Sequence, residues 1–371
     1  AAVRLLLIAR PFVFHGGVER ATAGLVGALV AHGVEVHLLS PPGQRPVPGV
    51  TLHRLPLPPL PSAARALALA AGARLVVARG AWDLVQSHER TLVQDVYRAG
   101  EGCHRAYLAS RAGPPARGAY HRVVLALERR VFARTPAIVA IARRGAREIA
   151  ALHGVGAARL SVVYNGVDLE RFHPRQRAAW RAPAREAAGL PRGAFALLFV
   201  GSGFERKGLG TALEALAALD DRASRLVVVG KGETRPWRAA AERLGVGGRV
   251  TWLGPQPEPE RWYAAADLVV LPSRYEPFGQ VHLEALAAGV AVVASREAGG
   301  AELIEDGRNG AVVDPHDAHA LAGAVERLRA ASADELSAAA RSSAEPYTFA
   351  RQVAGFAKVY RRLGAATPDF P

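Results

Sequence analysis

Short apolar runs alternate with longer amphipathic stretches along the chain. Residues 268–271 form an apolar run with the length of a buried strand, and the spacing of apolar positions at 279–288 is helical, with Gly289 placed to cap it. Near the amino terminus an apolar run at 3–9 leads into a helical pattern at 18–32. Strands that alternate with helices predict parallel sheets covered by helices.

Two blocks of this alternation are separated by a charged segment that contains three prolines. We expect one domain over residues 1–172, a connection over 173–194, and a second domain over 195–348. Residues 349–371 are expected to form a final helix, because apolar side chains recur there at helical spacing. A chain of 371 residues is long enough for two cores. The prediction is therefore α/β, with two doubly wound domains.

Composition narrows the choice of partners. The formal net charge is +14, which is compatible with nucleic acid or an anionic membrane surface. Only three of the 47 basic residues are lysine, and the arginines are spread along the chain without a nucleic-acid motif, so we expect no nucleic-acid partner. The half-apolar helix expected at 120–134 carries four arginines and either lies on an anionic membrane or is simply a solvated face.

Cysteine usage and hydrophobicity point to the cytoplasm. Cys103 is the only cysteine, so no disulfide can form within the chain. The apolar stretch at 67–78 is interrupted by Gly72 and Arg74 and is too short to cross a membrane. We therefore expect a cytoplasmic protein, with peripheral attachment to the inner face of the cell membrane as an open alternative.

Two glutamates flank the start of the helix at 279–288. The first N–H groups of a helix lack partners within the helix and attract anions such as phosphate. Glu284 lies inside this helix, where its carboxylate can accept hydrogen bonds from sugar hydroxyls, and Glu276 lies in the preceding loop. A nucleotide sugar would suit this arrangement. The alternative is a surface turn with two solvated glutamates.

A second glycine-containing loop follows the apolar run at 195–200. It spans Gly201 to Gly208 and carries Arg206 and Lys207 directly before a predicted helix. Arginine binds phosphate as a fork and lysine as a point charge. The loop lacks the signature of nucleotide triphosphatases. It therefore predicts a phosphate site, and the alternative is an ordinary basic turn.

Three features of the first domain are candidates for a substrate site. Gly16 and Gly17 follow the first strand, although the G-x-G-x-x-G fingerprint of dinucleotide binding is absent. Glu101 stands between two glycines after a predicted strand, and His88 follows another. Flanking glycines allow close approach of a ligand, and they also occur in ordinary turns.

Together these motifs resemble the GT-B glycosyltransferases of family 4 over nearly the whole chain. The residues that carry the resemblance are the pair Glu276 and Glu284, the loop 201–208, the segment 16–20 and the segment Asn165-Gly-Val-Asp168. Within the family, Gly-Ser-x-Phe-x-Arg-Lys-Gly and Asp95-Val-Tyr are similar to glucosyltransferases that act on lipopolysaccharide core heptose. The resemblance implies two Rossmann-like domains that face a central cleft, the first for the acceptor and the second for the nucleotide sugar, with the C-terminal helix crossing back to the first.

The resemblance also implies roles for individual residues. Arg206 and Lys207 would bind the donor diphosphate, Glu284 the ribose, and Glu276 the transferred sugar. The remaining donor-side residues would be Gly16, Gly17, Gly201, Leu253, Phe278, Gly279 and Gln280. Glu101 would be the acceptor-side base or sugar contact, with His88 as the alternative.

The implied reaction is retaining transfer of a hexosyl group from a nucleotide sugar, with UDP-glucose as the first choice. The acceptor would be a hydroxyl of a glycan or glycolipid such as lipopolysaccharide inner-core heptose. The sequence contains no Asp-x-Asp triplet, which agrees with a metal-independent enzyme without cofactor, and we expect a monomer. The alternatives are a GDP-mannose-dependent mannosyltransferase, a nucleotide-sugar epimerase and a polyanion-binding protein.

Overall fold

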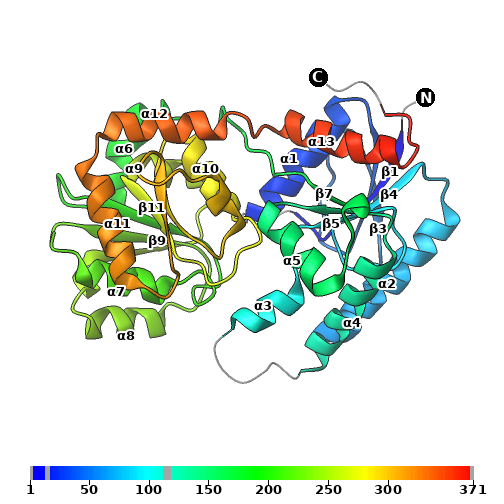
Figure 1. The fold of residues 1–371 in the computed structure, drawn as a ribbon, viewed down its shortest axis with the longest axis horizontal. Coiled ribbons are helices and arrows are strands. Elements are labelled where there is room, and N and C mark those ends of the chain that lie inside the picture. The colour runs from blue at the N-terminus through cyan, green and yellow to red at the C-terminus, as the bar shows by residue number, and fades with distance from the viewer. Residues whose placement is uncertain (1–2, 13–16, 112–117, 368–371) are drawn as a thin grey trace. The chain divides into compact units, whose positions relative to one another are not determined.

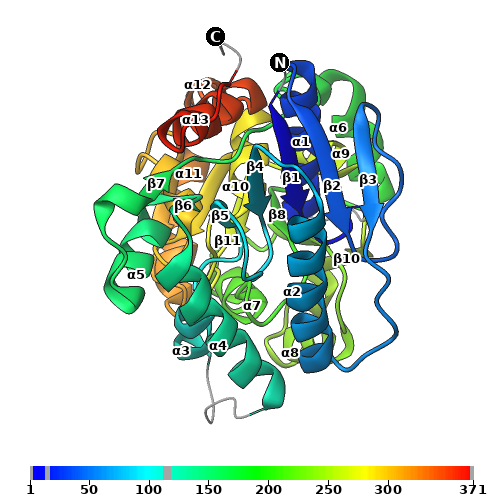
Figure 2. The same ribbon diagram turned by 90° about the vertical axis from the view of Figure 1, so that its right-hand side faces the viewer.

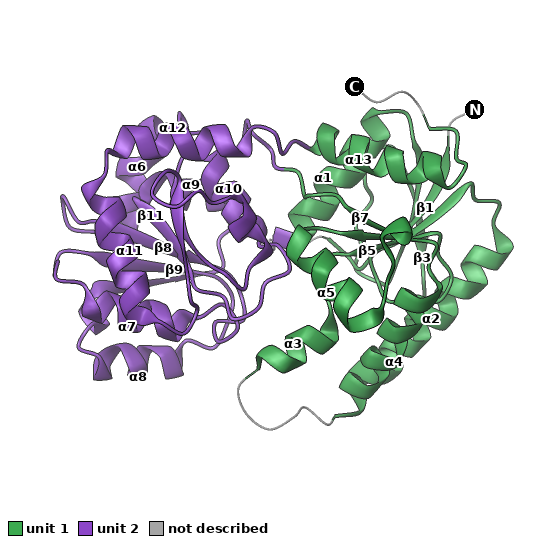
Figure 3. Ribbon diagram, viewed as in Figure 1, with its two compact units in different colours: residues 1–14, 18–166, 349–371 green, residues 15–17, 167–348 purple. Residues whose placement is uncertain are grey.

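A computed structural model of the protein describes residues 3–12, 17–111 and 118–367, which form two compact units (Figure 3). Unit 1 comprises residues 1–14, 18–166 and 349–371, and unit 2 comprises residues 15–17 and 167–348. Each unit contains one parallel sheet accompanied by helices, which confirms the predicted α/β class (Figure 1). No helix among the described residues has the length and apolar character that crossing a membrane requires.

Unit 1 contains a seven-stranded sheet with the order β3-β2-β1-β4-β5-β6-β7. Its strands are β1 (Arg4–Ile8), β2 (Glu35–Ser40), β3 (Val50–Arg54), β4 (Leu84–Ser87), β5 (Val96–Ala99), β6 (Ala137–Ala140) and β7 (Leu160–Val162). Its helices are α1 (Gly17–Ala31), α2 (Ser62–Arg79), α3 (His104–Ser110), α4 (Ala119–Arg134), α5 (Arg143–His153), the short 3₁₀ helix η1 (Ala157–Arg159) and the C-terminal α13 (Phe349–Arg362). α2 and α4 lie side by side (Figure 2).

Alternation along β1 explains why helices cover both faces of this sheet. Leu5 and Leu7 point to one face, where they belong to a buried cluster that includes α1 and the C-terminal helix α13. Leu6 and Ile8 belong to a different cluster, which α2 completes through Ala73. Because Leu5 to Ile8 of β1 are buried on both faces, the run that follows Arg4 is apolar without interruption from Leu5 to Ala9.

Unit 2 contains a six-stranded sheet with the order β10-β9-β8-β11-β12-β13. Its strands are β8 (Ala196–Val200), β9 (Arg225–Val229), β10 (Val250–Gly254), β11 (Leu268–Leu271), β12 (Ala291–Ser295) and β13 (Gly310–Val313). Its helices are α6 (Gln176–Ala187), α7 (Leu209–Ala218), α8 (Arg235–Arg243), α9 (Pro259–Ala265), α10 (Gln280–Ala287), α11 (Ala318–Ala330) and α12 (Ala333–Ala344), with η2 (Gly247–Arg249) and η3 (Gly299–Leu303) as 3₁₀ turns.

In both units the strand order reverses beside the first strand of the sheet. In unit 1 the reversal lies between β1 and β4, and in unit 2 it lies between β8 and β11. Loops that leave neighbouring parallel strands at such a point diverge to opposite sides and open a crevice at the carboxyl ends of the strands. We therefore expect the ligand-binding residues of each unit at the carboxyl ends of these strands.

The segment expected to connect the domains is largely ordered within unit 2. Residues 176–187 form α6, which packs against α9. Pro183 lies inside this helix, where a proline ordinarily disfavours helical structure.

Candidate active site

The loop after β8 passes directly across the end of β11, at the reversal point of unit 2. Gly208 ends this loop with φ of +78°, and a Cβ atom there would lie 1.9 Å from the carbonyl oxygen of Pro272. Only glycine combines that backbone conformation with so close an approach. The glycine therefore brings Arg206 and Lys207 up to the loop that carries Glu276.

Arg206 and Lys207 converge on the carboxylate of Glu276. Nη1 of Arg206 lies 3.2 Å from Oε2 of Glu276, and the buried Lys207 ammonium donates to the same oxygen. Burial alone would raise the pKa of Glu276, but the charges of Lys207 and Arg206 outweigh it and hold the pKa at about 2. Glu276 is therefore ionised at neutral pH, and the three side chains form one charged cluster with a net positive charge.

The helix α10 begins directly after this cluster and is buried along its whole length. Gly279 caps it with φ of +85°, and Gln280 is its first residue. Glu284 is buried within α10, and its Oε2 accepts a hydrogen bond of 2.9 Å from the hydroxyl of Tyr263 in α9. The Tyr263 hydroxyl thus orients a carboxylate whose oxygens can accept further hydrogen bonds from a ligand.

One buried histidine of this segment was not among the predicted site residues. His282 lies in the first turn of α10, and its Nδ1 lies 2.9 Å from the carbonyl oxygen of Gly279. Its Nε2 has no hydrogen-bond partner among the described residues. Burial lowers the pKa of His282 to about 4. A Cβ atom on Gly300 would come within 3 Å of this ring, so the absence of a side chain at Gly300 keeps room for it.

The other predicted donor-side residues lie in different places. Phe278 is buried immediately before α10, and Gly201 directly follows β8. Leu253 is half-buried in the edge strand β10, with β9 between it and β8. Gly17 is the first residue of α1, and Gly16 lies outside the described residues.

At the reversal point of unit 1, charged side chains gather after β1, β4 and β5. Arg10 binds Glu89 through a forked pair of hydrogen bonds of 2.9 and 3.0 Å. Glu101 lies between two guanidinium groups, 2.8 Å from Arg10 and 2.9 Å from Arg90. Burial would raise the pKa of Glu101, but the two arginines outweigh it and the pKa is lowered. A carboxylate stabilised in this way is a weak base and a good acceptor of hydrogen bonds from sugar hydroxyls.

A buried carboxylate that was not among the predicted site residues supports this cluster. Glu128 of α4 accepts hydrogen bonds from the backbone N–H groups of His104 and Arg105, at 2.6 and 3.2 Å, and so caps α3. It also lies 3.2 Å from Nη2 of Arg90. Glu128 therefore fixes both the helix that follows Glu101 and the arginine that binds it.

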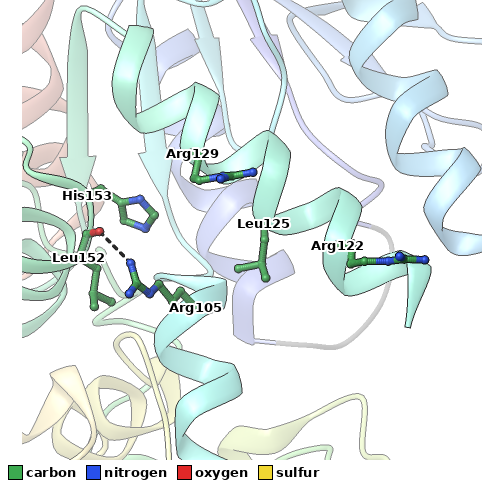
Figure 4. A pocket seen from close by; sticks show the side chains of 6 residues that line it. All are labelled: Arg105, Arg122, Leu125, Arg129, Leu152 and His153. Carbon is green, nitrogen blue, oxygen red and sulfur yellow. Dashed lines mark hydrogen bonds between the residues drawn. The ribbon is translucent and has the colours of Figure 1, made fainter. Parts of the chain in front are cut away.

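Two large pockets are found in this part of unit 1. One, of about 620 Å³, is lined by Glu101, Arg90 and Arg10 together with prolines, leucines and Tyr120. The other, of about 740 Å³, lies between α3, α4 and the end of α5, as Figure 4 shows. Its lining residues are Arg105, Arg122, Leu125, Arg129, Leu152 and His153, and Arg105 donates to the carbonyl oxygen of Leu152 at 3.4 Å.

His88, the acceptor-side alternative, is buried at the end of β4. It lines a small cavity together with Glu89, Glu101 and Arg98. The structure therefore brings His88 and Glu101 to one place, at the carboxyl ends of neighbouring strands, as their positions after predicted strands allowed.

Comparison with known proteins gives one family match in each half of the chain. Residues 15–171 match the family described as Glycosyltransferase Family 4, and residues 194–330 match the family described as Glycosyl transferases group 1. Over 205 residues the chain is 39% identical to D-inositol 3-phosphate glycosyltransferase 2 of Catenulispora acidiphila. The aligned region covers 52% of this chain and 47% of that protein. The chain thus spans about half the length of this curated relative.

Solved structures resemble the chain over almost its full length. WaaG, a glycosyltransferase involved in lipopolysaccharide biosynthesis, matches with a TM-score of 0.81 and 24% identity over 95% of this chain and 98% of its own. HepE of Anabaena, solved in complex with UDP-glucose, matches with a TM-score of 0.74 and 19% identity over 98% and 99% of the two chains. With a family match on each half and this shared architecture, the chain belongs to glycosyltransferase family 4 and has the GT-B fold.

Proposed function

We propose that the protein is a retaining, metal-independent glycosyltransferase that moves a hexosyl group from a nucleotide sugar to a hydroxyl group. The observation that carries this proposal is the cluster of Arg206, Lys207 and Glu276 at the reversal point of the unit 2 sheet. Retention of configuration is proposed from the likeness to family 4.

The cluster suits a departing nucleoside diphosphate. Two cations in partly buried surroundings stabilise the negative charge that grows on the leaving diphosphate as the glycosidic bond breaks. The N-terminus of α10 lies in the same loop region and adds partial positive charge. In this proposal these groups perform the role that a divalent ion has in other transferases.

Donor identity is proposed from Glu284 and from the structural neighbours. A buried carboxylate held by Tyr263 is suited to accept hydrogen bonds from the two ribose hydroxyls of a nucleotide. UDP-glucose is the first donor to test because HepE was solved with it. GDP-mannose belongs in the same panel, since ribose and diphosphate are common to both.

Two acceptor classes are proposed. The likeness to WaaG favours an acceptor of lipopolysaccharide biosynthesis, such as the core heptose expected from the sequence, whereas the higher identity to the Catenulispora protein favours D-inositol 3-phosphate. Both offer ring hydroxyls, and the pocket beside Glu101, which is lined by charged and by apolar residues, is the proposed place for either.

Replacement of Lys207 by alanine tests the proposal. Without this ammonium group the leaving diphosphate loses a buried positive charge, so we expect turnover to fall by on the order of a hundredfold. Turnover is measured as nucleoside diphosphate released and glycoside formed from UDP-glucose and each acceptor. Lys358→Ala, on the exposed face of α13, is the matched control and should keep the wild-type rate.

Other outcomes would contradict the proposal. If the Lys207→Ala variant transferred sugar at the wild-type rate, this site would have no part in the reaction. Conversion of the nucleotide sugar without acceptor would indicate an epimerase, because a transferase releases its diphosphate only when an acceptor is present. NMR of the anomeric proton in the product decides between retention and inversion.

We also propose that unit 1 contacts an anionic membrane surface through the arginines of α4. Arg122 and Arg129 are exposed beside the pocket of Figure 4. Each exposed arginine adds about 1 kcal/mol of attraction to an anionic bilayer. Arg129→Ser should therefore lower cosedimentation with vesicles containing phosphatidylglycerol about fivefold, whereas the exposed Arg192→Ser in unit 2 should not. Equal binding to vesicles of phosphatidylcholine alone would contradict this contact.

A further inference from the structure

A row of three buried polar side chains leads from the C-terminal helix to the reversal point of the unit 1 sheet. The hydroxyl of Tyr360 in α13 donates to Oε1 of Gln86 in β4 at 2.6 Å. Nε2 of Gln86 lies 2.9 Å from Nε2 of His88. All three side chains are buried, so no solvent competes for these hydrogen bonds.

The direction of these bonds fixes which nitrogen of His88 carries hydrogen. An amide nitrogen can only donate, so Nε2 of His88 must accept the hydrogen bond from Gln86. Burial, assisted by the nearby Arg98, lowers the pKa of His88 well below its usual value, so the ring is neutral at pH 7. A neutral imidazole carries one N–H, which is therefore on Nδ1.

Two donors without partners belong to residues that line the small cavity at this place. Nδ1 of His88 and Nε of Arg98 have no hydrogen-bond partner within the described ranges, and both residues line a cavity of about 20 Å³. The far end of Arg98 is already engaged, because its Nη2 donates to Oδ1 of Asn165 at 2.6 Å. Buried donors are rarely left unsatisfied, and a space of this size holds one water-sized oxygen.

On the basis of the transferase activity proposed above, we infer that this cavity receives one hydroxyl oxygen of the sugar acceptor, which accepts hydrogen bonds from His88 and Arg98. His88 then contacts the acceptor as an N–H donor and not as a proton-abstracting base. Gln86 and Tyr360 are positioning residues, because they select the tautomer of His88 and touch no substrate. Glu101 lines the same cavity and is left to bind neighbouring hydroxyls.

The tautomer is tested directly by ¹⁵N NMR of histidine-labelled full-length protein, in which bare and protonated ring nitrogens have well separated shifts. The signal of His88 is assigned by its loss in His88→Gln. We expect hydrogen on Nδ1 in the wild type. In Gln86→Glu we expect hydrogen on Nε2, because a carboxylate of the same shape can only accept. Hydrogen on Nε2, or on both nitrogens, in the wild-type protein at pH 7 would overturn the inference.

The contact with the sugar is tested by steady-state kinetics with UDP-glucose as donor. The acceptor is D-inositol 3-phosphate or the core heptose, whichever of the two the wild-type enzyme glycosylates. Gln86→Glu should raise the acceptor KM roughly five- to tenfold, as for loss of one hydrogen-bond donor, and leave the KM for UDP-glucose unchanged. Tyr360→Phe should act in the same direction and serves if Gln86→Glu does not fold. Gln176→Glu, at the start of α6, is the matched control.

The outcomes separate this inference from the proposed function. A switched tautomer with an unchanged acceptor KM would show that only water fills the cavity, and the inference would be wrong while the transferase stands. Equal rises in both KM values would indicate a general structural defect and also contradict it. No transfer by the wild type to either acceptor would contradict the proposed function and the sugar contact together, while the NMR spectrum would still decide the tautomer.

Discussion

At the scale of single residues, two carboxylates of one motif have different surroundings. Glu276 lies between Arg206 and Lys207, whereas Glu284 accepts a hydrogen bond from Tyr263. The spacing of the two glutamates along the chain predicted that both would serve a ligand. Their partners were not predictable from that spacing, because Lys207 and Tyr263 reach them only through the pairing of β8 with β11 and the packing of α9.

The buried His282 predicts a dependence of stability on pH. Its pKa is about 4 in the folded protein, against an ordinary value of 6.5, because burial disfavours the charged ring. The unfolded chain therefore binds the proton more readily, and stability is lost as pH falls from 6.5 towards about 4, by roughly 1.4 kcal/mol per pKa unit of difference. His282→Gln should weaken this dependence in urea unfolding measured across that range.

The exposed His319 provides the matched control, since His319→Gln should retain the pH dependence of the wild type. An unchanged slope of unfolding free energy against pH in His282→Gln would contradict the assignment.

At the scale of elements, the amphipathic patterns predicted several helices to within a few residues. The spacing at 18–32 and 120–134 corresponds to α1 and α4. The helix α6 was not predicted, because Pro174, Pro183 and Pro191 indicated only a connection between domains there. Tertiary contacts outweigh this local preference, and such contacts join residues about 80 positions apart.

The contacts that stabilise α6 come from arginines spaced four residues apart on one face. Arg177, Arg181 and Arg185 donate to the last carbonyl oxygens of α9, including those of Ala265 and Ala266, at distances of 2.7 to 3.1 Å. Arg181 and Arg185 also pair with Asp267. Cations at the C-terminus of a helix satisfy its free carbonyls and complement its dipole.

We expect Arg181→Met to lower the free energy of unfolding of unit 2 by about 1–3 kcal/mol, because it leaves the Asp267 carboxylate and backbone carbonyls with fewer donors. The midpoint of urea unfolding reports the change. Arg192→Met, in the exposed turn that follows α6, should have no effect, and an equal loss in both variants would refute this account of α6.

At the scale of the whole molecule, unit 1 is completed by a helix from the far end of the chain. Val353, Phe356, Val359 and Tyr360 of α13 are buried in the same cluster as β1 and α1. The sequence predicted this helix and its apolar positions. Its place against β1 could be inferred only from the family resemblance, because periodicity shows that a face is buried and not what covers it.

A chain that ends at Thr348 should therefore lose the fold of unit 1 and keep that of unit 2. Each buried side chain of α13 contributes roughly 1.5–3 kcal/mol, and four of them amount to much of the net stability of a domain. Among the described residues, none beyond 348 belongs to the core of unit 2. In hydrogen exchange of this shortened chain, the backbone amides of β1 and β4 should be unprotected, whereas those of β8 and β11 should remain protected.

A chain that ends at Ala365 retains α13 and is the control. Wild-type protection of β1 and β4 in the shorter chain would mean that α13 is dispensable.

This arrangement has a consequence for synthesis on the ribosome. The strands of unit 1 emerge first, but residues 167–348 must be translated before Phe349 appears, which takes roughly ten to forty seconds at ~5–20 residues per second. During that interval the apolar side chains of β1 and α1 that α13 later covers are exposed to solvent, and chaperones bind such surfaces. The half of the enzyme that is encoded first is thus the half that finishes folding last.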